Sequence, residues 1–483
     1  MNKQICRIEF ILVLSVLPWL ALPPDLFAQD REVTVNIHLR GVYESRISLL
    51  ALSGSGTFKT IAEAPGVKNN ETTRLSVNRE SLPGEFVVRF DYKEKETSTP
   101  YPSEKHIFIN DQDLELWVSP MYCNNADSTR FQEDEKENVA FVRFTKESGR
   151  QKDQLGLLQN FLMNYDDTGS KFYKQGVKEY EQRRKAYNQW LVARSHQDNA
   201  LFVSALFCFQ YVPEISWKGS ETDRIRSLIN HYFDGMDFKN PLLIKTSGLN
   251  KWMDVYVNLY GQLSTTALIR DSLFPLAGKV AIEKARLGHP RVYGWMVDYF
   301  YRGYETNGLP AGMKILEPYL NDPNCLTSKR EEIARRLKGI KTLIPGSKAP
   351  DISLRDPEGN LFELNHFETP HRYILIFFWS AGCSHCIEMV NALYPWQQKA
   401  EVQQKIMVLA ISLDETVEEM KAWQLKRKQL SGWKQLQSGE GIRSKVASDY
   451  YVLATPVMVL LDAKTREIVA LPNTLDELIN AVE

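Results

Sequence analysis

The sequence predicts a multidomain protein in which a small antiparallel β domain, an all-helical domain and a C-terminal α/β domain follow one another. The chain has 483 residues, which is enough for about three domains of roughly 150 residues each. Hydrophobic residues make up 43% and charged residues 25%, a balance typical of folded globular domains. The spacing of apolar residues changes twice along the chain, and these changes place the domains at 30–146, 150–343 and 345–483.

The first 28 residues have the pattern of a secretory signal peptide. Lys3 and Arg7 precede an apolar run at 8–22, and Ala28 is the small residue expected before a cleavage site. The run is about fifteen residues long and contains Pro18, so it falls short of the ~20 residues that span a bilayer. We therefore expect export with cleavage, and an uncleaved membrane anchor is the alternative.

Period-two alternation of apolar and polar residues predicts the β domain. Val33, Val35 and Ile37 alternate with polar residues, which is typical of a half-buried strand. Further strands are expected at 47–52, 85–92, 107–109 and 114–118. The charge run at 133–137 is interpreted as a solvated connection.

Apolar residues at helical spacing, such as Leu155, Leu158 and Leu162, predict the helical domain. Its frequent aromatic residues are interpreted as core, with a peptide-binding groove as the alternative; they include Trp190, Trp217, Trp252 and Trp295. Three scattered cysteines, Cys123, Cys208 and Cys325, are interpreted as small buried side chains, although one pair among them could be bridged. The 59 basic residues nearly balance the 60 acidic residues, so we expect no nucleic-acid partner.

The main chemical signal lies in the C-terminal domain. A continuous apolar run at 373–379 predicts a strand buried on both faces, and therefore a parallel sheet. The run leads directly into Cys383-Ser384-His385-Cys386 and an apolar-patterned helix. Two cysteines three positions apart on the first helical turn can join or separate with little backbone movement. The helix N-terminus stabilises a thiolate on Cys383, which is thus the predicted nucleophile, and Cys386 is the predicted resolving cysteine.

Two further observations bear on the cysteine pair: His385 lies between the two cysteines, and no further metal-ligand pair follows them. An imidazole between the two cysteines can stabilise the thiolate and so tune the redox pair; an exposed polar residue is the alternative. A structural zinc site would need a second ligand pair, and neither cysteine nor histidine follows Cys386. We expect no metal and no cofactor other than the Cys383–Cys386 disulfide.

Thr455-Pro456 stands at the entrance of a second strongly apolar strand. Proline is tolerated at the start of a strand but not at its centre. Pro456 is a candidate for a cis peptide bond.

With these motifs in place, the chain from about Pro345 to Glu483 resembles bacterial envelope thioredoxins of the TlpA/ResA type, and so implies a thioredoxin fold. The resemblance rests on the Gly359 turn, the Trp379 strand end, the CSHC site, the strand that ends at Asp414 and Thr455-Pro456. It implies that Thr455, Pro456 and Trp379 bind the substrate. It also implies a periplasmic location, protein thiols or disulfides as partners, and a membrane electron donor or acceptor.

The sequence departs from that family's pattern at four positions. Phe377 stands where a buried carboxylate is common, Gly382 where a tryptophan is common, and Asn391 where the helix usually has a proline. Glu388 lies two residues after the second cysteine, whereas related reductases have a glutamate three residues after it. It is therefore a weak candidate for proton relay.

We interpret the protein as an exported thiol–disulfide oxidoreductase and favour the reductant over the oxidant. The alternative is a binding, scaffold or redox-sensing protein whose redox-type domain is accessory, but an intact cysteine pair favours the enzyme. Peroxidase chemistry would need a threonine-containing loop around a single reactive cysteine, which the residues before Cys383 do not provide.

Overall fold

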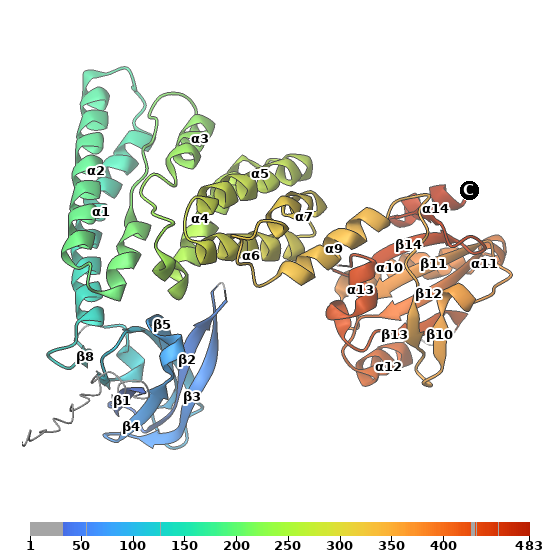
Figure 1. Ribbon diagram of the computed structural model, residues 1–483, viewed down its shortest axis with the longest axis horizontal. Helices are drawn as coiled ribbons and strands as arrows, with labels where there is room; N and C mark the ends of the chain where they lie inside the picture. Colours follow the sequence, from blue (N-terminus) through green and yellow to red (C-terminus); the bar gives the residue numbers. More distant parts are fainter. Residues whose placement is uncertain (1–31, 55, 126, 427–429, 431, 453) are drawn as a thin grey trace, which may run out of the picture.

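The computed structural model describes residues 32–483 except 55, 126, 427–429, 431 and 453. The predicted signal peptide at 1–28 lies outside the described residues. Figure 1 shows a β-rich part and an α/β part at opposite ends of the long axis, with a helical part joining them. Within the part of the chain that the structure describes, no helix combines the length and hydropathy needed to cross a membrane.

The β-rich part consists of two four-stranded sheets, with the orders β4-β1-β7-β8 and β3-β2-β5-β6. The strands are β1 (Val33–Leu39), β2 (Glu44–Ser53), β3 (Thr57–Lys68), β4 (Thr72–Val77), β5 (Gly84–Lys93), β6 (Tyr101–Ile109), β7 (Leu114–Val118) and β8 (Thr129–Phe131). Neighbouring strands pair antiparallel, except β1 and β7, which pair parallel. Apolar side chains from both sheets, among them Val35 and Leu49, form one core.

The charge run at 133–137 contributes to a helix terminus instead of a solvated connection. Helix α1 (Glu137–Asn164) begins inside the predicted β domain. Glu135 is only 4% exposed, and its carboxylate accepts hydrogen bonds from three backbone N–H groups in the first turn of α1. Glu137 accepts two more from backbone N–H groups at the start of η4 (Phe202–Gln210). The sequence interpretation was wrong for Glu135 and Glu137, because charge density alone does not reveal the N–H groups that these carboxylates satisfy; Glu133, Asp134 and Lys136 are exposed as expected.

The helical part is built around an aromatic core. Besides α1 and η4 it contains α2 (Lys171–Gln197), α3 (Glu221–His231), η5 (Pro241–Lys245), α4 (Gly248–Leu263), α5 (Ala267–Arg286), α6 (Pro290–Thr306), α7 (Pro310–Ile315), α8 (Glu317–Leu320) and α9 (Arg330–Thr342). Tyr256 and Tyr293 are almost fully buried in this core. Trp252 packs against Tyr232 with ring centroids 4.5 Å apart, which supports the interpretation of these aromatic residues as core.

The C-terminal part contains a seven-stranded mixed sheet with the order β10-β9-β13-β12-β11-β14-β15. Its strands are β9 (Ser353–Arg355), β10 (Leu361–Glu363), β11 (Tyr373–Trp379), β12 (Ile406–Ser412), β13 (Lys434–Gln437), β14 (Val457–Asp462) and β15 (Ile468–Ala470). Its helices are α10 (Ser384–Gln397), α11 (Ala400–Lys405), α12 (Val417–Leu425), α13 (Lys445–Asp449) and α14 (Leu475–Val482). The sheet is parallel from β11 through β13, and β14 runs antiparallel to β11.

Strand β11 contributes to two separate cores because its side chains alternate between the faces of the sheet. Ile374 and Ile376 contribute to a core that includes α13. Leu375 and Phe377 contribute to a core that includes α10, α12 and α14. All of β11 is buried, as the continuous apolar run predicts. This rigid central strand determines where the following cysteines lie.

Candidate functional site

The cysteine pair lies at the carboxyl end of β11, where the chain leaves the centre of the sheet. Cys383 is the N-cap residue of α10, and Cys386 lies in the first turn of that helix. The two residues form a disulfide with their Cα atoms 5.3 Å apart. The spacing of the motif on a helix start thus brings the two sulfurs together, as the sequence suggests.

The two cysteines differ in accessibility. Cys386 is fully buried, whereas Cys383 is partly exposed. The backbone N–H of Cys386 donates a hydrogen bond of 3.0 Å to Cys383 Sγ. This N–H group and the positive end of the α10 dipole both favour negative charge on the outer sulfur. Cys383 is therefore the sulfur that a molecule from solution can reach and the one best placed to carry a thiolate.

Thr455 and Pro456 lie beside the outer sulfur, although they are distant in sequence. Cys383 Sγ is 3.3 Å from the carbonyl oxygen of Thr455. The hydroxyls of Ser380 and Thr455 are 3.2 Å apart, which joins the loop after β11 to the residues before β14. The Thr455–Pro456 peptide bond is cis. Both residues are partly exposed, so solvent reaches this segment next to the disulfide.

His385 and Glu388 form an exposed pair on the outer surface of α10. His385 Nδ1 lies 3.3 Å from Glu388 Oε2, and the two side chains are 79% and 75% exposed. The imidazole thus has a carboxylate partner as well as two neighbouring cysteines. Solvent and this carboxylate both weaken any effect of His385 on the sulfurs.

Trp379 does not lie where a substrate could touch it. The side chain is 1% exposed, and its ring packs on Trp423 with centroids 4.1 Å apart. This burial contradicts the expected contact with substrate. Trp379 is the last residue of a strand whose alternate side chains point into the core containing α10 and α12, so its ring stabilises the domain instead.

Two departures from the family pattern now have a structural setting. Phe377 is fully buried and packs edge-to-face on Trp433 at 6.0 Å between ring centroids. The interior below the disulfide is therefore apolar at this position. Gly382 is exposed, and a Cβ atom added to it would meet no atom within 4 Å. The space next to Cys383 is therefore open at the position of this Cβ atom.

Asp414 is a site residue that the sequence analysis did not identify. It is 8% exposed, and its carboxylate accepts hydrogen bonds from the Ala381 N–H at 2.8 Å and the Ser412 hydroxyl at 2.7 Å. The loop that carries Cys383 is thereby attached to the end of β12. The sequence pattern could have predicted this position. The carboxyl ends of adjacent parallel strands lie at one edge of the sheet, and Asp414 follows such a strand, so it is expected near the cysteine pair.

Comparison with known proteins agrees with this geometry. Residues 345–474 match the AhpC/TSA family. The C-terminal domain is thioredoxin-like. A search of curated proteins finds no match to the chain. The family match covers the sheet, the cysteine pair and the Thr455–Pro456 segment.

Several solved structures are similar to parts of this chain. The thioredoxin domain of a thiol-disulfide oxidoreductase from Bacteroides vulgatus is 29% identical, with 29% of this chain and 96% of that chain covered and a TM-score of 0.26. A thiol:disulfide interchange protein from Bacteroides sp. is 30% identical, with 29% and 90% covered and a TM-score of 0.25. A thioredoxin-like protein from Bacteroides caccae is 17% identical, with 56% and 96% covered and a TM-score of 0.33.

The other three cysteines in the described part of the chain take no part in this site. Cys123, Cys208 and Cys325 are free in the structure, and Cys123 and Cys325 are buried. Burial raises the pKa of Cys208 to about 12 and that of Cys325 to about 11, so both thiols stay protonated and unreactive near neutral pH. Among the described residues, no group of three or more His, Cys, Asp or Glu side chains could hold a metal ion.

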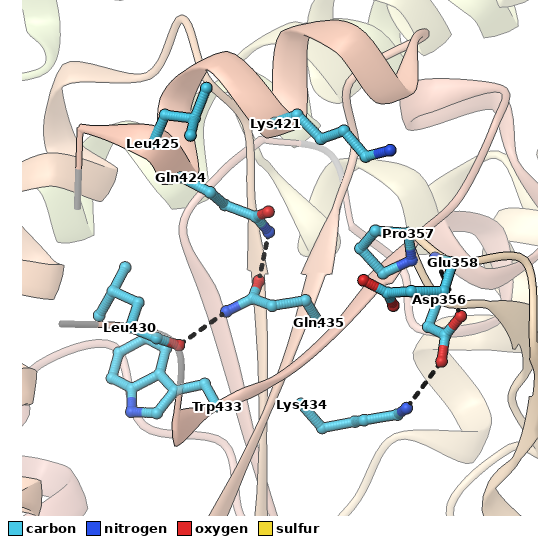
Figure 2. A pocket seen from close by; sticks show the side chains of 10 residues that line it. All are labelled: Asp356, Pro357, Glu358, Lys421, Gln424, Leu425, Leu430, Trp433, Lys434 and Gln435. Atoms are coloured by element: carbon cyan, nitrogen blue, oxygen red, sulfur yellow. Dashed lines mark hydrogen bonds and ion pairs between the residues drawn. The ribbon is translucent and has the colours of Figure 1, made fainter. Parts of the chain in front are cut away.

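A separate cavity of about 530 Å³ lies beside β13 and α12 and is not lined by the cysteine pair. Figure 2 shows that some of its polar side chains pair with one another. Lys434 Nζ lies 3.0 Å from Asp356 Oδ2, and Gln424 donates a 3.0 Å hydrogen bond to Gln435. The hydrogen bond from Lys434 lowers the pKa of Asp356 to about 2. These pairs involve only part of the polar lining, and we assign the cavity no ligand.

Proposed function

We propose that the protein is an exported thiol–disulfide oxidoreductase of the TlpA/ResA type that acts on protein substrates. The observation that carries the proposal is the position of Cys383 Sγ, which is partly exposed, receives the Cys386 N–H and lies 3.3 Å from the carbonyl oxygen of Thr455. A reactive outer sulfur, a buried partner sulfur and accessible backbone groups together suit disulfide exchange with an extended peptide. The match to the AhpC/TSA family supports the same class of chemistry.

In the reductive direction, the reduced protein holds two thiols. The Cys383 thiolate attacks one sulfur of a substrate disulfide, and a mixed disulfide forms as the other substrate sulfur leaves as a thiolate. The Cys386 thiolate then attacks Cys383 Sγ, and the second substrate sulfur leaves. The substrate gains two electrons and two protons, and the protein is left with the Cys383–Cys386 disulfide seen in the structure. Reduction of that disulfide by a membrane electron donor completes the cycle.

Substrate recognition is proposed to use the main chain near Thr455. An extended substrate segment beside this residue can pair with its backbone groups, which places the substrate sulfur next to Cys383 Sγ. Main-chain pairing carries little sequence specificity, so the same site would serve several protein substrates. Selection among them is left to other surfaces of the molecule.

Two cysteine variants test the proposed chemistry. Cys383→Ser is expected to abolish reduction of insulin disulfides, because the nucleophile is lost. Cys386→Ser is expected to accumulate a mixed disulfide with substrate, visible as a band that disappears on reducing gel electrophoresis. Cys208→Ser is the matched control and should retain activity, since Cys208 packs near Met236 in the helical part. Full activity in both active-site variants would overturn the proposal.

We propose that the direction of electron flow is reductive. The reduction potential of the Cys383–Cys386 couple, measured against a glutathione or dithiothreitol buffer, decides this point. A potential of about −270 mV is that of a reductant, whereas about −120 mV is that of a strong oxidant. A value near the second figure would reverse the proposed direction and leave the exchange chemistry intact.

Export is proposed to follow cleavage after Ala28. Mass spectrometry of the protein recovered from the envelope of an expressing Gram-negative bacterium is expected to give an N-terminus at Gln29. Retention of the first 28 residues in a membrane fraction would instead support the anchored alternative.

A further inference from the structure

Helix α9 of the helical part reaches into the thioredoxin-like domain with a buried arginine. Arg336 is 4% exposed. Its Nη1 donates to the carbonyl oxygens of Ala447 and Val452, both at 3.2 Å, and its Nη2 donates to that of Ile442 at 3.2 Å. Its Nε lies 3.2 Å from Glu305 Oε1 on α6. One guanidinium therefore joins a carboxylate of the helical part to three backbone carbonyls of the other domain.

These carbonyls belong to the chain that leads into the substrate site proposed above. Val452 lies three positions before Thr455 in the sequence, and Thr455 carries the carbonyl oxygen next to Cys383 Sγ. A planar fork of N–H donors sets the relative positions of its acceptors, because each bond has a preferred direction. Arg336 thus holds the backbone at Val452, three positions before Thr455.

Packing between the two parts supports the same role. Tyr451 has a φ of +50°, a left-handed backbone conformation that a non-glycine residue keeps only when its surroundings hold it. Its side chain packs against the core of the helical part. A Cβ atom on Gly339 of α9 would lie 2.8 Å from the carbonyl oxygen of Ser448 and 3.2 Å from Tyr451 Cβ, so the two backbones approach closely. The chain at Ser448 and Tyr451 is therefore held from outside its own domain.

We infer that Arg336 is a positioning residue through which the helical part holds the substrate-binding backbone at Thr455. The inference rests on the proposed function, and it assigns to the helical part a role in binding protein substrates. Small disulfides without a peptide chain do not use the backbone at Thr455. Their reduction should therefore depend on the cysteine pair and not on Arg336.

The experiment compares full-length wild type, Arg336→Lys and Arg466→Lys. Lysine keeps the charge opposite Glu305 but has no fork to bind three carbonyls. Arg466 is the matched control, because it is also buried and its Nε donates to the Leu364 carbonyl at 3.0 Å, away from the Thr455 segment. The measurements are kcat and KM for insulin reduction, the rate with dithiobis-nitrobenzoate, and hydrogen–deuterium exchange at 454–457.

Arg336→Lys is expected to raise the KM for insulin about tenfold, the effect of losing roughly one charge-assisted hydrogen bond. Exchange at 454–457 should become about tenfold faster, while the rate with dithiobis-nitrobenzoate stays unchanged. Arg466→Lys should change none of these three readouts. Equal loss with both substrates in Arg336→Lys, or exchange at 454–457 that stays as in the wild type, would overturn the inference. If the wild type reduces neither substrate, the proposed function fails, and the exchange measurement still decides the role of Arg336.

Discussion

The backbone N–H of Ala381 donates a 2.8 Å hydrogen bond to the carboxylate of Asp414. Ala381 stands two residues before Cys383, and Asp414 stands two residues after the end of β12. The bond therefore attaches the loop carrying the reactive sulfur to the neighbouring parallel strand. A buried carboxylate in this position has a structural role, and its removal should affect the loop first.

Asp414→Ala is expected to lower the free energy of unfolding by about 1–3 kcal/mol, because it leaves the Ala381 N–H and the Ser412 hydroxyl without their acceptor. Asp414→Asn keeps an acceptor oxygen and should lose less. Urea unfolding at neutral pH measures both changes. Glu415→Ala is the control: its carboxylate is 69% exposed and pairs with Arg443, so its loss should cost less than about 1 kcal/mol. Equal effects of Asp414→Ala and Glu415→Ala would contradict the assigned role.

Two glycines in helices should respond to alanine with opposite signs. Alanine is favoured over glycine inside a helix by about 1 kcal/mol. Gly339→Ala should nevertheless be destabilising by about 1–2 kcal/mol, because the new Cβ would lie 2.8 Å from a backbone oxygen and α9 would have to move. Gly303→Ala in α6 meets no atom within 4 Å and should be stabilising. Thermal unfolding of both variants measures the change in stability. A stabilising effect of Gly339→Ala would mean that α9 and α13 pack less closely than in the structure.

Glu85 should make the stability of the interface between the β-rich and helical parts depend on pH in the acid range. Its carboxylate accepts a 2.6 Å hydrogen bond from the Ser247 N–H, and His106 Nδ1 lies 2.6 Å away. Burial raises the pKa of Glu85, but the hydrogen bonds from His106 and Ser247 outweigh burial and bring it below the ordinary value of 4.5. The stabilisation is therefore fully present above pH 4.5 and is lost as the pH falls through the lower, folded-state pKa.

Urea unfolding of wild type and Glu85→Gln at several pH values between about 7 and about 3 tests this expectation. The wild type should be the more stable at neutral pH, and its advantage should shrink below pH 4.5. Glu104→Gln is the control, since the Glu104 side chain is 50% exposed and should show no such trend. A difference between wild type and Glu85→Gln that does not vary with pH would show that the carboxylate charge is not the cause.

His385 and Glu388 should shift the reduction potential in opposite directions. If the imidazole stabilises the Cys383 thiolate, His385→Ala makes the couple more reducing, and Glu388→Gln makes it more oxidising by removing the neutralising carboxylate. Because both side chains are more than 70% exposed, each shift should be small, on the order of 30 mV or less. Equilibration with glutathione measures both shifts, and shifts of the same sign would exclude this tuning.

Much of the site follows from local sequence patterns. Short stretches of sequence predict three features of the site: the buried strand β11, the cysteine pair at the start of α10 and the proline at the start of β14. These features depend on neighbouring residues, which set the hydrophobic periodicity and the positions where helices and strands begin. The family resemblance implies a substrate-binding role for Thr455 and Pro456, and the structure has the Thr455 carbonyl oxygen 3.3 Å from Cys383 Sγ. The same reasoning failed for Trp379, because a strand-end residue can face either the substrate or the core, and only its packing on Trp423 decides between them.

Short-range patterns were sufficient for the fold class and for the position of the cysteine pair at the start of α10. Contacts between distant segments decided other features, namely the attachment of Ala381 to Asp414, the hydrogen bond of Arg336 to the carbonyl of Val452 and the hydrogen bonds of Glu137 to the start of η4. The physical reason is that a buried polar side chain is stabilised by the particular donor or acceptor that folding brings to it. The partners of Asp414 and Arg336 lie 33 and 116 positions away in the chain, and no local window contains both.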